Sequence, residues 1–174
     1  DISNGGLNDF VIRLAAFHLR TGDLEAHHEL CAEMLGRFAN TELMASRDRV
    51  AKSYLAVPPL HPDSPCLDQA VALARKLDDQ IIMFPVCRGM AEYRMGNHEK
   101  AMSELLSAVE DSNLPRVHAL ALPYCAMATH RLGNSEGARD YLRRAREAFA
   151  RAKERFRTGV YSYWHDLIFT ELAL

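Results

Sequence analysis

Apolar and polar positions follow one another along this chain with the spacing of helices rather than of strands. Leucine, alanine, arginine and glutamate dominate, whereas runs of β-branched residues and Asn-Gly hairpin signals are nearly absent. This pattern predicts an all-α protein. The helices are expected in pairs, with units at about 7–39, 42–77, 80–112 and 114–156, followed by a last helix at 159–174.

One short motif recurs at three of the expected turns. Arg, any residue, Gly and then Asp or Asn stand at 20–23, 94–97 and 131–134. Glycine permits the left-handed turn that ends a helix, and Asp or Asn can cap the helix that follows. The glycines of the last two copies are 37 residues apart, and those of the first two are 74 apart. This period predicts a solenoid of paired helices, with a degenerate unit between the first two copies.

Small residues at fixed distances from the turns would let paired helices approach closely. They are Gly89, Ala101 and Ala108 around the second copy, and Ala126, Ala138 and Ala145 around the third. This spacing resembles the tetratricopeptide repeat (TPR), closely over about 82–150 and less closely in the first unit. The resemblance implies a right-handed superhelix of about four helix pairs with a C-terminal capping helix. In the degenerate unit, a proline-rich segment at 58–65 replaces the glycine turn, because proline cannot continue a helix.

A second resemblance concerns the order of the units. The first unit, the proline-rich segment, the stretch GMAEYRMGNHEKAMSELLSA at 89–108 and a closing helix with Trp164, His165 and Asp166 follow one another. This order resembles the C-terminal repeat region of large bacterial serine/threonine protein kinases. It implies a non-catalytic interaction or regulatory region attached to a kinase or another effector. The chain begins with Asp and ends within an apolar stretch, so we expect it to be part of a larger protein.

The TPR resemblance also implies a concave groove, lined by fixed positions of the first helix of each pair. The candidate partner-binding residues are Arg20, Met90, Tyr93, Arg94, Tyr124, Met127, His130 and Arg131. Methionine and tyrosine in the middle of the groove suit an apolar helix or an extended segment of a partner. The same stripe equally fits a core covered by a terminal helix of the chain. The three arginines either pair with carboxylates of a partner or neutralise carbonyls at helix ends.

Charge and apolar runs narrow the range of partners. Residues 139–157 carry eight basic and three acidic side chains, a net charge of +5, although the whole chain carries −2. This basic stretch could meet an acidic partner, a phosphate or a membrane surface, but a solvated outer helix face is favoured. An acidic remainder without an aromatic stacking array argues against nucleic acid. Apolar runs are too short to cross a membrane, so no membrane contact is expected within this chain.

Candidate chemistry is sparse. The four cysteines, Cys31, Cys66, Cys87 and Cys125, form no CxxC pair and are interpreted as structural thiols, which favours a reducing, cytoplasmic location. His27 and Cys31 have the spacing of two metal ligands, but without a second pair packing is favoured. No phosphate-binding glycine loop, GxSxG or HExxH motif occurs. We therefore predict a protein that is not an enzyme and has no cofactor.

Three functions remain open. The first is a scaffold that binds a peptide or helix of a partner protein, or of its own parent protein, in the concave groove. The alternative is a sensor that binds a small apolar or acidic ligand, which a closed groove with a buried cavity would indicate. A third possibility is a homodimer formed through the aromatic segment at 160–169, the most aromatic part of the chain.

Overall fold

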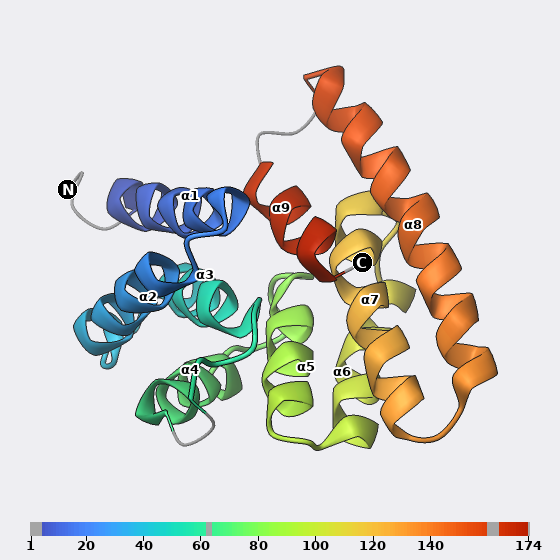
Figure 1. The fold of residues 1–174 in the computed structure, drawn as a ribbon, viewed down its shortest axis with the longest axis horizontal. Coiled ribbons are helices and arrows are strands. Elements are labelled where there is room, and N and C mark those ends of the chain that lie inside the picture. The colour runs from blue at the N-terminus through green and yellow to red at the C-terminus, as the bar shows by residue number, and fades with distance from the viewer. Residues whose placement is uncertain (1–4, 62–63, 160–163, 174) are drawn as a thin grey trace.

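The computed structural model describes residues 5–61, 64–159 and 164–173 of the 174-residue chain. These residues form helices and contain no strand, which confirms the all-α class (Figure 1). The helices are α1 Gly5–Thr21, α2 Leu24–Phe38, α3 Met44–Leu55, α4 Pro65–Arg75, α5 Phe84–Arg94, α6 His98–Glu110, α7 Pro115–Arg131, α8 Ser135–Arg157 and α9 Trp164–Ala173. In this described part, no helix combines the length and apolar character needed to cross a membrane.

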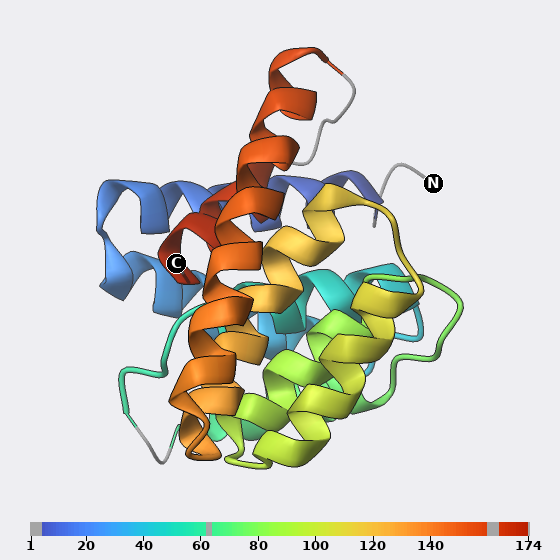
Figure 2. The same cartoon turned by 90° about the vertical axis from the view of Figure 1, so that its right-hand side faces the viewer.

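The helices pack as consecutive pairs, α1 with α2, α3 with α4, α5 with α6 and α7 with α8. The first helices of these pairs also contact one another in order, from α1 through α3 and α5 to α7. We call this series the inner row. Helix α9 contacts both ends of it, α1 and α7, and also touches α8 (Figures 1 and 2).

The glycine turns have the predicted conformation. Gly22, Gly96 and Gly133 have φ angles of 78°, 79° and 85°, in the left-handed region that side chains disfavour. Each glycine therefore ends one helix and lets the next begin two residues later. The expected caps differ among the three turns. Asp23 accepts a hydrogen bond from the Ala26 amide at 3.1 Å, and Asn134 caps α8 in the same way, whereas Asn97 makes no side-chain cap.

Proline marks the starts of three helices. Pro65 and Pro115 are the first residues of α4 and α7, and Pro85 lies in the first turn of α5. The first turn tolerates proline because its backbone nitrogen needs no hydrogen there. Pro123 lies inside α7, which continues through it to Arg131. Positions 62 and 63 of the proline-rich segment lie outside the described residues.

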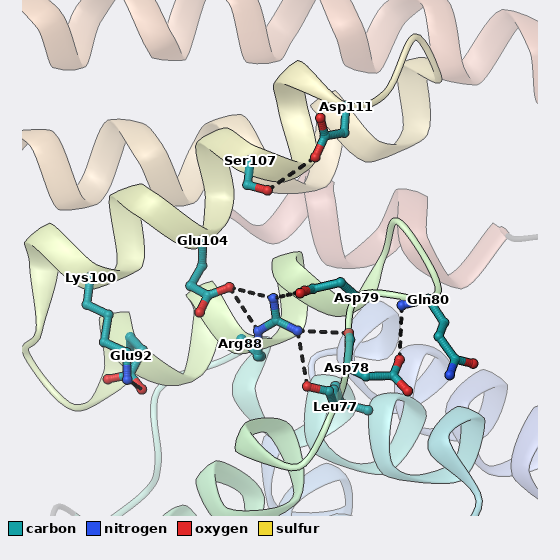
Figure 3. A network of polar contacts seen from close by, with 10 residues as sticks. All are labelled: Leu77, Asp78, Asp79, Gln80, Arg88, Glu92, Lys100, Glu104, Ser107 and Asp111. Carbon is teal, nitrogen blue, oxygen red and sulfur yellow. Dashed lines mark hydrogen bonds and ion pairs between the residues drawn. The ribbon is translucent and has the colours of Figure 1, made fainter.

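Polar side chains fix the connection between α4 and α5 against the third pair (Figure 3). The Arg88 guanidinium donates to the backbone carbonyls of Leu77 and Asp78, at 3.1 and 2.8 Å, and to the Glu104 carboxylate on α6 at 2.8 Å. It also pairs with Asp79 in the connection. One arginine therefore holds a non-helical segment, α5 and α6 in a single arrangement.

Candidate functional site

Half of the candidate partner-binding residues come together in one cluster within the inner row, formed by Met90, Tyr93, Arg94 and Tyr124. The rings of Tyr93 and Tyr124 meet edge to face with centroids 5.8 Å apart, and the Arg94 guanidinium lies 5.7 Å from the Tyr93 centroid. Met90 and Tyr124 are only 0% and 1% exposed. These two side chains are part of the core, and a partner cannot reach them in this structure.

The polar atoms of this cluster bind the end of α3. Arg94 Nε donates to the Leu55 carbonyl at 3.0 Å, and the Tyr124 hydroxyl donates to the Ala56 carbonyl at 3.1 Å. Carbonyls at a helix C-terminus lack partners within the helix, so these donors satisfy them. Burial raises the pKa of Tyr124 to about 12, which keeps its hydroxyl a donor. Arg94 thus serves a helix end, but the end belongs to α3 and not to its own helix.

The other four candidates lie at the surface or near α9. Arg20 is exposed and pairs with Glu171 of α9 at 2.5 Å. Met127 and His130 line an open groove of about 390 Å³ between α7 and α8, which Ala173 of α9 borders. Arg131 is exposed at the end of α7. The structure therefore gives Arg20, Arg94 and Arg131 three different environments.

Helix α9 lies between α1 and α7, the two ends of the inner row (Figure 1). The buried side chains of α9 lie on one face of the helix. Asp166 and Phe169 are about one turn apart on this face, and Phe169 is only 1% exposed. Its Glu171 side chain reaches the end of α1 through Arg20. The expected aromatic segment falls partly outside the description, because residues 160–163 and the side chain of Trp164 are not described. Phe169, its last aromatic residue, packs within its own chain.

Charged side chains of α3 and α9 are buried around the same cavity. Lys52 donates to Asp48 Oδ2 at 2.9 Å, and the two residues are 3% and 7% exposed. Asp166 of α9 is 3% exposed and adds a second carboxylate. Burial by itself would lower the pKa of Lys52, but the charges of Asp48 and then Asp166 raise it above its usual value. These carboxylates thus favour the ammonium form of Lys52 in the interior, whereas burial raises the pKa of Asp48 above its usual value.

This cavity, of about 150 Å³, adjoins these charges, and we call it the chamber. Its charged lining residues are Asp48, Arg49 and Lys52 of α3, Arg116 of α7 and Asp166 of α9; His165 and apolar side chains, among them Ile12, Met83 and Phe84, complete the wall. Among the residues that the structure describes, Oδ1 of Asp48 and Oδ1 of Asp166 have no hydrogen-bond partner. The chamber thus combines carboxylate and cationic groups in an interior that shields them poorly from one another.

Sequence analysis did not find this group. Asp48 and Lys52 stand one turn apart on a helix face that also carries Ala51 and Leu55, and both of these are buried. Charged residues on an apolar face were the available signal. The residues near Asp166 come from α3, far away in the sequence, so the sequence order gives no sign of them. Only the packing of α9 brings these groups together.

The interpretation of His27 and Cys31 as packing residues agrees with their contacts. His27 Nδ1 lies 3.0 Å from the Ala15 carbonyl, and burial lowers the pKa of the ring to about 4. Cys31 Sγ lies 3.6 Å from His27 Nε2, and burial raises the pKa of the thiol to about 12. Within the described ranges, no three His, Cys, Asp or Glu side chains gather to hold a metal ion. All four cysteines are free thiols.

No protein-family model matches this chain, and no curated protein or solved structure shows a significant similarity to it.

Proposed function

We propose that this chain is a TPR-like interaction scaffold whose concave face holds a helix. The superhelix would be right-handed and contain about four helix pairs, with the inner row as its concave side. The three positive-φ glycine turns and the regular packing of first helices support this arrangement. The resemblance to kinase repeat regions makes a regulatory region of a larger signalling protein its most natural setting.

The observation that carries the proposal is the position of α9. This ten-residue helix bridges the two ends of the inner row, where a partner helix could also lie, with Phe169 buried and Glu171 paired to Arg20. A helix that places one apolar face in a groove is a common mode of peptide recognition. We infer that α9 is a built-in occupant of the groove, for which a helix of a partner protein or of the parent protein competes.

This proposal changes the roles of the candidate residues. Arg94 and Tyr124 fix the end of α3, and Met90 is part of the core beneath the groove. Arg20, by contrast, contacts the occupant directly. Met127 and His130 line the open groove beside the end of α9, so a longer occupant would extend over them.

The test uses a labelled peptide of residues 164–173 and the full chain. Truncating a buried Phe to Ala costs about 3–5 kcal/mol, so Phe169→Ala should release α9 from the groove more often. Apparent affinity rises with the fraction of molecules whose groove is open. We expect the peptide to bind the Phe169→Ala chain at least tenfold more tightly than the unchanged chain, measured by fluorescence anisotropy.

The matched control is Phe10→Ala, because Phe10 is 61% exposed on α1 and its truncation opens nothing. A peptide that itself carries Phe169→Ala should not bind. Circular dichroism verifies that the variant chain remains helical; if it does not, Glu171→Lys weakens α9 more gently by placing a lysine opposite Arg20. Failure of the peptide to bind either folded variant would refute the scaffold proposal.

A further inference from the structure

The chamber is a different site from the groove that α9 is proposed to occupy. Asp166 of α9 nevertheless forms part of its wall. Asp48, Arg49 and Lys52 come from α3, Arg116 comes from the first turn of α7, and Asp166 comes from α9. Its volume of about 150 Å³ equals that of an engineered cavity that holds benzene. A ligand of about six to eight non-hydrogen atoms therefore matches its size, by comparison with benzene.

One part of the chamber wall favours a hydrogen-bond donor with positive charge. Asp48 and Asp166 are both more than nine-tenths buried, and each has one carboxylate oxygen without a hydrogen-bond partner among the described residues, although His165 Nε2 lies 3.8 Å from Oδ1 of Asp166. Lys52 donates to the other oxygen of Asp48. Buried carboxylate oxygens without donors are unfavourable and rare in folded proteins. A primary ammonium carries three donors and can serve both residues at once.

The arginines of the wall favour the opposite charge. Arg49 and Arg116 line the same cavity, so a ligand with positive charge alone would be repelled by them. A ligand with negative charge alone would be repelled by Asp48 and Asp166. Arginine recognises carboxylates well because its planar donors match the two oxygens. A molecule with both charges fits the wall, whereas a molecule with either one does not.

We propose that the chamber binds a small zwitterion of the amino-acid type, with its primary ammonium between Asp48 and Asp166 and its carboxylate toward Arg49 and Arg116. This site goes beyond the scaffold function, because it takes a small molecule and not a helix. Since Asp166 belongs to α9, the zwitterion binds the closed form of the protein and stabilises it. Water alone in the chamber is the competing explanation.

The experiment is isothermal titration calorimetry of the full chain with ω-amino acids from glycine to 5-aminopentanoate. The series varies the distance between the two charges. For the tightest member, the amine and the carboxylic acid of the same length serve as single-charge analogues. The zwitterion should bind at least tenfold more tightly than either analogue.

Two variants assign the ends of the ligand. Asp166→Asn keeps the shape of the side chain but removes its charge, so it should weaken zwitterion binding at least tenfold. Arg116→Gln should weaken binding of the zwitterion but not that of the amine analogue. Asp140→Asn on the exposed side of α8 is the matched control and should bind as the unchanged chain does. Circular dichroism confirms that each variant is folded.

The outcomes separate this site from the helix-binding proposal. If no ω-amino acid binds, or if the analogues bind as tightly as the zwitterion, the chamber holds only water or an unselective solute, and the inference is wrong. Equal binding by Asp166→Asn also overturns it. None of these results bears on whether the α9 peptide binds the Phe169→Ala chain.

Discussion

At the scale of single residues, Gly89 sets the distance between α5 and α6. A Cβ atom at this position would lie 2.5 Å from Leu105 Cγ and 2.8 Å from its Cδ2 atom. Leu105 is fully buried, so it has little freedom to move away. The expectation from sequence that small residues permit close helix packing thus has a direct physical basis here.

Replacing Gly89 with Ala should destabilise the fold by about 1–3 kcal/mol, the usual cost of overpacking a core. Gly36 is the matched control, because it also lies inside a helix but has no atom within 4 Å of its Cβ position. Gly36→Ala should stabilise the protein by about 0.4–1 kcal/mol. Urea unfolding followed by circular dichroism measures both changes. Equal effects of the two substitutions would show that α5 and α6 separate freely.

Glu92 concentrates polar contacts at a single buried carboxylate. Its oxygens accept hydrogen bonds from Arg75 Nε at 2.9 Å, Lys100 Nζ at 2.8 Å and Asn97 Nδ2 at 2.7 Å. The bond from Arg75 is the main reason why the pKa of Glu92 falls from 4.5 to about 2. Asn97 is therefore engaged with Glu92 and does not cap α6.

This pKa shift predicts a pH dependence. A carboxylate whose pKa is lowered by folding stabilises the protein above its unfolded pKa, and the contribution disappears as the pH falls through the folded value. The stability difference between the unchanged chain and Glu92→Gln should thus be constant above pH 4.5 and shrink between pH 4.5 and about 2. Urea unfolding across this range tests it. A difference that does not vary with pH would mean that Glu92 is not held as an anion.

At the scale of helices, local signals in the sequence predicted the helical class and the turns, but not which side chains are exposed. The all-α class and the left-handed glycine turns follow from residue type, because glycine alone adopts positive φ at low cost. The exposure of Met90 and Tyr124 could not be predicted in this way. Helical spacing shows which side chains share a face, but it does not show that the end of α3 packs against that face. Asp48 and Lys52 were missed for the same reason.

The polar residues after two of the turn glycines, Asp23 and Asn97, have different partners, so replacing them should have different effects. Asp23 caps α2 through the Ala26 amide, so Asp23→Ala should cost about 1 kcal/mol. In Asn97→Ala no cap is lost, but Glu92 loses one of its three donor residues. Combining each substitution with Glu92→Gln separates the cases: the effect of Asp23→Ala should persist unchanged, whereas that of Asn97→Ala should diminish. Thermal unfolding measures these double-mutant cycles, and equal coupling of both residues to Glu92 would contradict the assignment.

At the scale of the whole molecule, α9 connects elements that are otherwise distant. The other helices contact mainly their neighbours along the chain, as in solenoid proteins, but α9 contacts both α1 and α7. Its position between the two ends of the inner row could not be predicted from its sequence, which fits a capping helix equally well. The contacts with both α1 and α7 appear only when the chain is folded.

Loss of α9 packing should therefore destabilise only the helices that α9 contacts. In Phe169→Ala, amide hydrogen exchange should accelerate in α9 and in the facing parts of α1 and α7, while α4 and α6 should keep their protection. Exchange measured by mass spectrometry distinguishes these regions. Uniform acceleration along the chain would show that α9 belongs to the cooperative core and is not an exchangeable occupant.

The bridge between α1 and α7 also has a mechanical consequence. A solenoid whose units touch only their neighbours can stretch like a spring, because a small change at each interface adds to a large change in length. Helix α9 joins the first and last inner helices directly, with Arg20 and Glu171 at one of its contacts. The two ends cannot move apart while α9 remains bound, so this series of helix pairs is braced at a fixed span, and under the scaffold proposal it would become elastic only when α9 leaves.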